Sequence, residues 1–431
     1  MIPIKRPHDV SEETVDIKGI NSSGEGVGRL QDGSVIFIPR TVPGDTVRVA
    51  IMIRKSRWSR GRLIEIMSPG LDRVEPLCEY YGSCNGCALQ HIDYDAQLKW
   101  KVNSVEESFK RIAGMEVAVS CIEGSPEEYN YRSQLNFTLL RLPNSRVIAG
   151  FHSLDSPQRI EDIEENCVLG EESLIKVWQS LRASWGENAR LLPAGKKLSL
   201  TLRTVQGGIV LVIRGGQGPG RPDLLIGKIS ELISIWSIDS KGNKNLLAGS
   251  KRLFDHRLGN TVEIEATSFL QANRKCEILL NDWVCDQVNP HKGMRLIDAY
   301  CGFGSYGRSM MVQGVEVVGI ERDLDKDVVL DCDGSGSLKC LKGTVEMVLP
   351  RVLPADAIIL NPPRIGLSEL VSTLIKDRGP YLVIYVSCDP ATLARDIARI
   401  GDAYEITEVR SFDLFPQTPH TETVAVMHRK M

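Results

Sequence analysis

The 431-residue sequence has no long hydrophobic run, no large net charge and no low-complexity tract, and each absence excludes a class of protein. No apolar run approaches the roughly 20 residues that a helix needs to cross a bilayer, so the chain is not expected to span a membrane. The net charge of −3 does not mark a general nucleic-acid binder, so any basic surface must be local. The apolar fraction of 42% excludes a disordered tail protein and suffices for two or three domains.

A secretory signal is also missing, since residues 1–7 show neither an apolar core nor a cleavage site. The 11 cysteines are odd in number, and without an export signal they argue against a disulfide framework. We therefore expect a reducing cytoplasm, in which cysteines serve as metal ligands or as reactive thiols.

Three regions with different patterns divide the chain. Residues 1–67 contain short strand-like runs separated by glycines, which predicts a small β-barrel of the oligonucleotide-binding (OB) type. Residues 68–265 hold a cysteine-rich turn, a helix over 93–113 that could pack on the last domain, and a mixed α+β pattern. Residues 266–431 alternate helix and strand, which predicts an α/β fold with a doubly wound parallel sheet.

A basic segment lies in the predicted barrel. Trp58 is its one aromatic residue, and no acid interrupts it. Its basic residues are Arg48, Arg54, Lys55, Arg57, Arg60 and Arg62. Such a segment can be a charged sheet edge that blocks aggregation, or a surface that follows phosphates while the aromatic stacks on a base. The predicted barrel favours the second interpretation.

A thiol near the C-terminus lies between a predicted strand and a predicted helix. The strand covers 381–387, Cys388 follows it, and Pro390 opens a helix over 391–400. The positive end of that helix should favour the thiolate, which is the nucleophilic form of cysteine. A lone cysteine is more often a small core residue, so the neighbouring motifs must decide between the two interpretations.

A candidate nucleotide-type pocket precedes this thiol. The predicted strand 295–299 runs into Gly302 and Gly304, and the strand 315–320 ends at Glu321, whose carboxylate can bind ribose hydroxyls. The Gly-x-Gly turn is shorter than a dinucleotide fingerprint, which favours an adenosine without phosphates, such as S-adenosylmethionine. Residues 361–364, Asn-Pro-Pro-Arg, follow the strand 356–360 and belong to the same edge of the sheet.

Three cysteines with the spacing Cys-x5-Cys-x2-Cys form a candidate metal site. They are Cys78, Cys84 and Cys87, and Cys167 is the nearest plausible fourth ligand after Cys121. Four thiolates suit zinc or an iron–sulfur cluster. Structural zinc usually takes two paired knuckles, so three clustered cysteines and one distant partner favour the cluster.

In this order along the chain, the motifs resemble the RNA 5-methyluridine methyltransferases, in particular the iron–sulfur 23S rRNA enzymes with an N-terminal TRAM domain. The resemblance covers nearly the whole chain, including the Ser-Cys-x-Pro motif at 387–390 and residues 415–422. The residues it implies are Cys388 and Glu422 for catalysis; Gln271, Tyr300, Ser305, Glu321 and Asn361 for S-adenosylmethionine; and Cys78, Cys84, Cys87 and Cys167 for a four-iron–four-sulfur cluster. The family usually has Asp at Asn361, and Asn at Ser305 and Asp389.

The resemblance implies methylation of carbon 5 of a uridine in 23S rRNA, with tRNA as the alternative substrate. Cys388 would add to carbon 6 of the uracil, and Glu422 would later remove the proton from carbon 5. The base must leave its stack in the RNA to be reached. We expect a cytoplasmic, monomeric RNA-binding enzyme of the class EC 2.1.1.

Three other functions remain open from the sequence. An amino-group methyltransferase also uses Asn-Pro-Pro, but it usually has an aromatic residue where this chain has Arg364. A radical methylthiotransferase combines a cluster with a TRAM domain, but it uses three cysteines. A non-catalytic RNA-binding protein derived from the enzyme is the third, because Asn361 and Ser305 depart from the family pattern.

Overall fold

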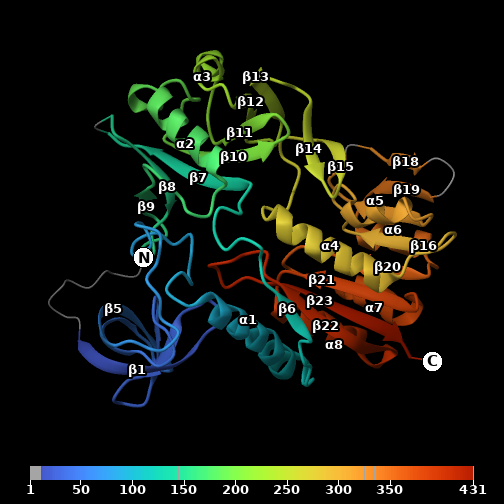
Figure 1. Cartoon of the computed structure of the whole chain (residues 1–431), viewed down its shortest axis with the longest axis horizontal. Coiled ribbons are helices and arrows are strands. Elements are labelled where there is room, and N and C mark those ends of the chain that lie inside the picture. The colour runs from blue at the N-terminus through green and yellow to red at the C-terminus, as the bar shows by residue number, and fades with distance from the viewer. Residues whose placement is uncertain (1–10, 144, 325, 333–335, 431) are drawn as a thin grey trace. The chain divides into compact units, whose positions relative to one another are not determined.

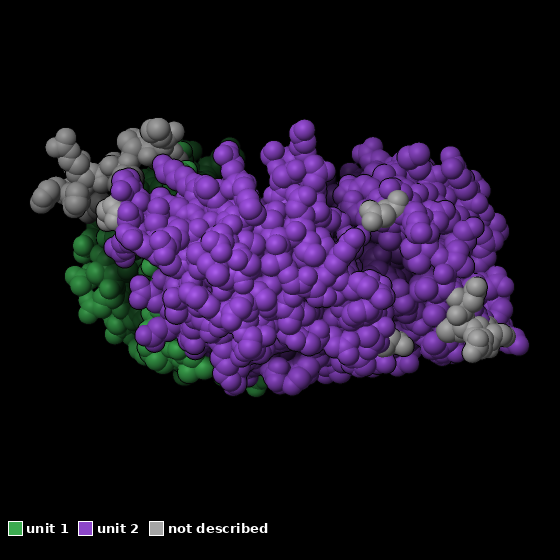
Figure 2. Space-filling model, turned by 90° about the horizontal axis from the view of Figure 1, so that it is seen from above, with its two compact units in different colours: residues 1–101, 150–163, 415–419 green, residues 102–149, 164–414, 420–431 purple. Residues whose placement is uncertain are grey.

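The computed structural model describes residues 11–143, 145–324, 326–332 and 336–430 (Figure 1). The expectation for residues 1–7 therefore lies outside the described residues. Figure 2 shows the two compact units of the chain: residues 1–101, 150–163 and 415–419, and residues 102–149, 164–414 and 420–431. Within the described residues, no helix is both long and apolar enough to cross a membrane.

The first unit contains a closed five-stranded barrel. Its strands, in the order β1-β2-β3-β5-β4, are β1 (Glu12–Ile20), β2 (Gly26–Arg29), β3 (Val35–Ile38), β5 (Trp58–Ser68) and β4 (Thr46–Arg54). Alternating apolar residues fill the interior, among them Val15, Ile36 and Val49. A Cβ on Gly28 would lie 2.3 Å from the Val15 side chain, so this close crossing needs glycine. The predicted OB-like barrel is confirmed.

The cysteine-rich turn follows the barrel in the same unit. Helix α1 (Tyr94–Ser108) begins after it and continues into a single π-helical turn (Phe109–Ala113). Residues 150–163 add the paired ends of β8 (Val147–His152) and β9 (Ile160–Asp162). The backbone amide of Asn85 donates to the carbonyl of His152, which fastens the turn to this hairpin.

The second unit contains the mixed α+β region that the sequence predicts. Its elements are β7 (Gln134–Arg141), α2 (Glu172–Ser184), a 3-10 turn (Glu187–Ala189), β10 (Lys197–Val205), β11 (Gly208–Arg214), α3 (Pro222–Lys228), β12 (Leu232–Ile238), β13 (Lys244–Gly249) and the hairpin of β14 (Leu253–Arg257) and β15 (Asn260–Ile264). The sheet order is β13-β12-β11-β10-β7. Trp178 of α2 stacks on Phe137 of β7, with ring centroids 3.7 Å apart, and fixes the helix to the sheet.

A nine-stranded sheet forms the C-terminal part of this unit, in the order β18-β19-β17-β16-β20-β21-β23-β22-β6. The strands are β16 (Arg295–Ala299), β17 (Glu316–Glu321), β18 (Val328–Cys332), β19 (Gly336–Lys342), β20 (Ala357–Leu360), β21 (Leu382–Ser387), β22 (Tyr404–Phe412), β23 (Glu422–Arg429) and β6 (Cys121–Glu123). Strands β19, β17, β16, β20 and β21 are parallel neighbours, as predicted. The edge strand β18 and the C-terminal β23 are antiparallel.

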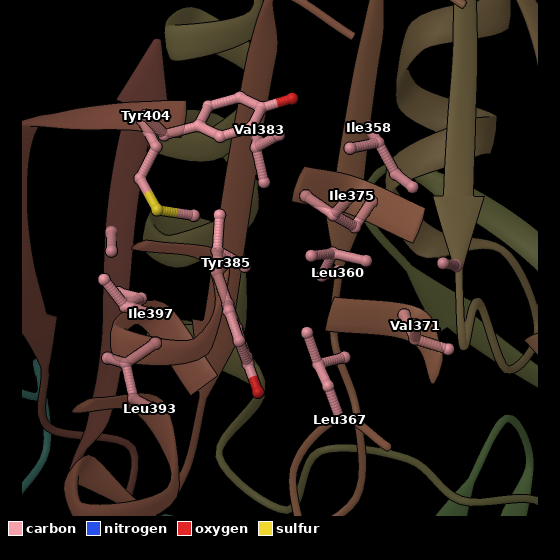
Figure 3. Close-up of a cluster of buried hydrophobic side chains, with 14 of the residues drawn as sticks. Ile358, Leu360, Leu367, Val371, Ile375, Val383, Tyr385, Leu393, Ile397 and Tyr404 are labelled. Carbon is pink, nitrogen blue, oxygen red and sulfur yellow. The ribbon is translucent and has the colours of Figure 1, made fainter. Parts of the chain in front are cut away.

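Helices cover both faces of this sheet. They are α4 (Arg274–Val288), α5 (Ser305–Met311), α6 (Val345–Val352), α7 (Glu369–Arg378) and α8 (Pro390–Ile400), with a 3-10 turn at Gly401–Ala403. Figure 3 shows part of the apolar cluster between the strands and helices α7 and α8. Val105 and Phe109 also belong to this cluster. Asp298 of β16 accepts from the Gly307 amide of α5, so α5 covers the other face.

The sequence pattern predicts a helix over 269–288, and the helix in the structure begins later. Asn273 caps α4 by accepting from the Cys276 amide, so the helix covers only Arg274–Val288. An N-cap residue has non-helical backbone angles, and here its φ is −97° and its ψ is 90°. Residues 269–273 are therefore a separate, irregular segment with its own role in the site.

Candidate active site

A pocket opens at the carboxyl ends of the parallel strands. It is lined by Phe269, Leu270, Gln271, Glu277, Leu280, Asn281, Tyr300, Cys301, Gly302, Phe303, Ser305, Tyr306 and Asn361. Four of the five predicted cofactor residues are in this set: Gln271, Tyr300, Ser305 and Asn361. They come from three segments, namely residues 269–273, the turn between β16 and α5, and the loop after β20, and the sheet topology brings these segments together at its edge.

The turn after β16 owes its shape to unusual backbone angles. Tyr300, Gly302 and Gly304 have φ values of 63°, 58° and 82°, which two of the three reach without strain because they are glycines. Glu321, the fifth predicted residue, ends β17 and accepts hydrogen bonds from the amides of Gly302 (3.0 Å) and Asp323 (2.9 Å). Its carboxylate therefore holds the glycine turn and lies beside the pocket.

Sequence reasoning missed two polar residues of the pocket, Glu277 and Asn281. They are four positions apart on α4, so they share one face of the helix, and this spacing was the available signal. Glu277 is buried and pairs with Arg257. The Asn281 side-chain oxygen is buried and has no hydrogen-bond partner among the described residues, so it is free to accept from a bound group.

Cys388 lies where the sequence predicted, between β21 and α8, and it is half-buried. The expected preference for thiolate is wrong for this structure, because burial raises the pKa of the Cys388 thiol to about 11. The nearby Glu422 carboxylate raises the pKa further, and Arg364 lowers it. The helix end gives little help because the Asp389 carboxylate already accepts from the amides of Ala391 (2.9 Å) and Thr392 (3.0 Å).

Glu422 is the first residue of β23 and is only 3% exposed. Strand β23 runs antiparallel to β21, and Ser387 opposite Thr423 is the last pair of this ladder. Cys388 follows Ser387 and Glu422 precedes Thr423, and the Glu422 charge acts on the Cys388 thiol. Burial raises the pKa of the Glu422 carboxyl to about 8, and Arg364 opposes this shift. Its Oε2 atom has no hydrogen-bond partner among the described residues.

Arg364 is the cation of this site. It is exposed, it follows the Asn-Pro-Pro run after β20, and its charge lowers the pKa of both Cys388 and Glu422. The pocket adjoins this group, because Asn361 lines it and the Glu422 charge raises the pKa of the pocket residue Tyr306. A thiol, a carboxyl group and a guanidinium thus meet beside a polar pocket.

The sequence matches the model of the tRNA (uracil-5-)-methyltransferase family at residues 346–430 and that of the TRAM domain at residues 9–64. It is 30% identical to a protein of Halalkalibacterium halodurans named as an uncharacterized RNA methyltransferase, over 98% of both chains. The chain belongs to the RNA (uracil-5-)-methyltransferase family. A protein of Thermosynechococcus vestitus, also named as an uncharacterized RNA methyltransferase, is 30% identical over 95% of this chain and 96% of its own.

A solved structure of the same fold comes from Pyrococcus abyssi. It is a tRNA (uracil-54, C5)-methyltransferase in complex with S-adenosyl-L-homocysteine, and it matches with a TM-score of 0.71 at 23% identity. The match covers 96% of this chain and 100% of that one. The predicted fold, a doubly wound α/β domain with an OB-like barrel and a mixed middle region, is thereby confirmed.

The candidate metal site of this RNA methyltransferase looks different from its active site. Cys78, Cys84 and Cys87 lie in the first unit, and burial raises the pKa of Cys84 to about 11. Arg40 donates to the backbone carbonyls of Cys84 (2.8 Å) and Cys87 (2.5 Å). Cys167 belongs to the second unit. Among the described residues, no three His, Cys, Asp or Glu side chains are gathered as a metal site requires.

Ion pairs divide the basic segment of the barrel into two groups. Each residue of the first group pairs with an acid from another strand or turn: Arg48 with Glu65, Arg54 with Asp32 and Arg60 with Glu25. In the second group, Lys55, Arg57 and Arg62 have no ion pair among the described residues. Trp58 is 38% exposed and packs against Phe37. The charge available to a phosphate is thus smaller than the sequence suggested.

Proposed function

We propose that the chain methylates carbon 5 of a uridine in RNA, with S-adenosylmethionine as the methyl donor and Cys388 as the covalent nucleophile. The observation that carries this proposal is the proximity of Cys388 to the buried Glu422: the two residues adjoin Ser387 and Thr423, the last pair of β21 and β23, and the Glu422 charge acts on the Cys388 thiol. Glu422 is held in β23 by its pairing with β22, and Cys388 is attached directly to the last paired residue of β21. An amino-group methyltransferase would need neither group.

The polar pocket fits the cofactor. It offers the side chains of Gln271, Ser305 and Asn361, and the unpartnered oxygen of Asn281 can accept from an ammonium or amino group. Glu321 beside the glycine turn is an acceptor for ribose hydroxyls. When bound there, S-adenosylmethionine supplies the methyl group on its sulfonium.

The chemistry of the uracil ring explains why a thiol and a base are both needed. Carbon 5 of uracil is a poor nucleophile. Once Cys388 has lost its proton to solvent, addition of the thiolate at carbon 6 converts the ring to an enolate that is nucleophilic at carbon 5. After methyl transfer, Glu422 accepts the proton from carbon 5. The carbon 6–sulfur bond then breaks, which returns the thiolate and restores the ring double bond.

The electrostatics of the site suit this sequence of steps. A carboxyl group with a pKa of about 8 is close to neutral pH, where a general base is most effective. Cys388 has a pKa of about 11 although the Arg364 charge lowers it, so the residue is mainly a thiol and must lose its proton before the sulfur attacks. The Arg364 guanidinium lowers the pKa of both Cys388 and Glu422.

We propose 23S rRNA as the substrate, on the strength of the motif order along the chain. A tRNA substrate is the second candidate, favoured by the description of the matched family and by the substrate named for the Pyrococcus abyssi protein. The test is to incubate the purified chain with methyl-labelled S-adenosylmethionine and with either RNA, then digest and identify the nucleosides by mass spectrometry. Labelled 5-methyluridine in 23S rRNA alone supports the proposal, and label in tRNA alone supports the second candidate. The absence of 5-methyluridine from both would contradict the enzyme assignment.

We further propose that Cys78, Cys84, Cys87 and Cys167 hold a four-iron–four-sulfur cluster with a structural role. None of the ten cysteines whose side chains are described forms a disulfide, which is consistent with a role of these four as ligands. Their described arrangement does not by itself make a metal site, and no catalytic step depends on the cluster. Anaerobic purification followed by iron and sulfide analysis tests it. We also expect the enzyme to act as a monomer in the cytoplasm.

A further inference from the structure

The loop after β20 carries two groups of the active site, Asn361 in the pocket and Arg364 beside Cys388. Arg364 itself is exposed, so its position depends on how residues 361–367 are held. The loop ends at the buried residues Gly366 and Leu367. The carboxylate of Asp396, on helix α8, lies against these two residues.

Asp396 is 0% exposed and is bonded on both oxygens. Its Oδ2 atom accepts from the Leu367 amide at 2.7 Å and from the Tyr385 hydroxyl at 2.8 Å. Its Oδ1 atom accepts from Arg395 Nε at 2.9 Å. Figure 3 shows Tyr385 and Leu367 in the same apolar cluster, which excludes water from these bonds.

The loop fits closely around this carboxylate. Gly366 has a φ of +77°, and a Cβ at that position would lie 2.3 Å from Asp396 Oδ2. Arg395 also donates from Nη2 to the carbonyl of Ile365 at 2.7 Å. Two adjacent residues of α8 therefore bond to Ile365 and Leu367 of the loop and pack closely against Gly366 between them.

We propose that Asp396 is a positioning residue that holds the 361–367 loop so that the charge of Arg364 bears on Cys388 and Glu422. This role rests on the function proposed above. Helix α8 begins two residues after Cys388, and Tyr385 lies three residues before it. One carboxylate thus joins the strand and helix on either side of the thiol to the loop that carries the cation.

The charged and titratable groups around the two ends of this linkage are few. Arg395, Arg399, Tyr385 and the pocket residue Tyr300 face Asp396. Glu422, Arg364 and Asp389 face Cys388. Arg364 and Tyr306 face Glu422. Arg364 is the one positive residue among the described residues that face Cys388 and Glu422. A shift of the loop should therefore change the ionisation of Cys388 through this residue.

The test is the rate at which iodoacetamide alkylates Cys388 as a function of pH, followed by mass spectrometry of its peptide. This assay needs neither RNA nor cofactor. Asp396→Asn removes the charge and places an amide nitrogen against the Leu367 amide or the Tyr385 hydroxyl. We expect the alkylation curve to move to higher pH, in the direction that Arg364→Gln moves it. The double variant should show no further movement beyond Arg364→Gln.

Asp45→Asn is the matched control. Asp45 is also 0% exposed, accepts from the amides of Val42 and Gly70 and pairs with Arg73, but it lies in the barrel. It should lower thermal stability and leave the alkylation curve unchanged.

Tyr385→Phe removes a single hydrogen bond to Asp396 and should move the alkylation curve to higher pH by a smaller amount than Asp396→Asn. This second variant keeps the test valid if Asp396→Asn fails to fold. A folded Asp396→Asn or Tyr385→Phe variant with the wild-type curve would overturn the proposal. Methylation by the wild-type protein, measured on the same preparations, tests the proposed function separately.

Discussion

The edge of the C-terminal sheet and the cysteine-rich turn hold their reactive groups in opposite ways. At the sheet edge, Glu422 begins β23 and Cys388 directly follows β21, and the pairing of Ser387 with Thr423 holds the two neighbouring backbone segments together. In the turn, Cys84 and Cys87 are fixed mainly through their carbonyls, which Arg40 binds, and the thiols themselves are left without a metal geometry. The difference teaches that a sheet can hold two reactive side chains near each other without a ligand, whereas the proposed ligand set on the turn would need its metal to complete it.

The largest expected effect is at the sheet edge. Cys388→Ala removes the only group in the proposed site that can bond to carbon 6, so methylation should fall by roughly a thousandfold or more. Labelled methyl transfer to RNA measures this loss. Cys121→Ala, at an exposed cysteine of β6, is the control and should keep wild-type turnover. Normal turnover by Cys388→Ala would show that the site uses another nucleophile.

Glu422→Gln should stop the reaction at a later step. The methylated adduct cannot lose its proton, so a protein–RNA complex should persist on a denaturing gel while turnover falls on the order of a hundredfold. In the wild type, the carboxyl group must ionise to act as a base, so turnover should rise with pH up to about 8. If the variant turns over without an adduct, Glu422 has no part in proton removal.

The same substitution has a separate effect on stability. The pKa of Glu422 is raised in the folded protein from its ordinary 4.5, so its contribution to stability is full below pH 4.5 and is lost as the pH rises through about 8. Glu422→Gln removes that loss, and the variant should be more stable than the wild type at pH 8 by a margin that disappears near pH 4.5. Each pH unit within this window changes the free energy of unfolding by at most about 1.4 kcal/mol. Thermal unfolding across this pH range measures it.

The residues of the candidate active site could be predicted from the sequence better than the geometry of the cysteine-rich turn. Most of these residues belong to a short motif at the end of a single strand. Cys388 and Glu422 follow from short motifs, and Glu321 from a strand ending in an acid. The pKa of Cys388 could not be predicted, since it depends on burial and on Asp389 taking the helix amides. The start of α4 could not be predicted, because the apolar pattern of the helix continues into residues 269–273 and only the Asn273 cap separates the two.

Removal of the proposed metal should have an intermediate effect, and it sharpens the contrast with the sheet edge. The cluster would close a loop between Cys87 and Cys167, and by analogy with a covalent cross-link this is worth on the order of 2–4 kcal/mol. Iron chelation or Cys87→Ser should therefore lower the unfolding temperature, whereas Cys121→Ser should not. Equal unfolding temperatures, with no iron in the wild type, would leave the turn a purely protein structure.

Within the pocket we expect a smaller change. Gln271→Ala removes one polar contact from the irregular segment before α4, so the affinity for S-adenosylmethionine should fall about tenfold, or roughly 1.4 kcal/mol. Isothermal titration calorimetry without RNA gives this value directly. Gln313→Ala, at a glutamine outside the pocket, is the matched control. An unchanged affinity would place the cofactor elsewhere on the sheet edge.

The smallest effect is expected at the barrel, where the structure separates two kinds of arginine. Arg57 has no ion pair among the described residues, whereas Arg54 pairs with Glu13 and Asp32. If Arg57 contacts a phosphate, Arg57→Ala should weaken RNA binding a few-fold and reduce the slope of log affinity against log salt by about 0.7 to 0.9. Arg54→Ala should change the slope less, because that guanidinium is already neutralised by carboxylates. Equal slopes for the two variants would mean that the barrel ion pairs open when RNA binds, and the barrel would then resemble the cysteine turn in needing its ligand to set its geometry.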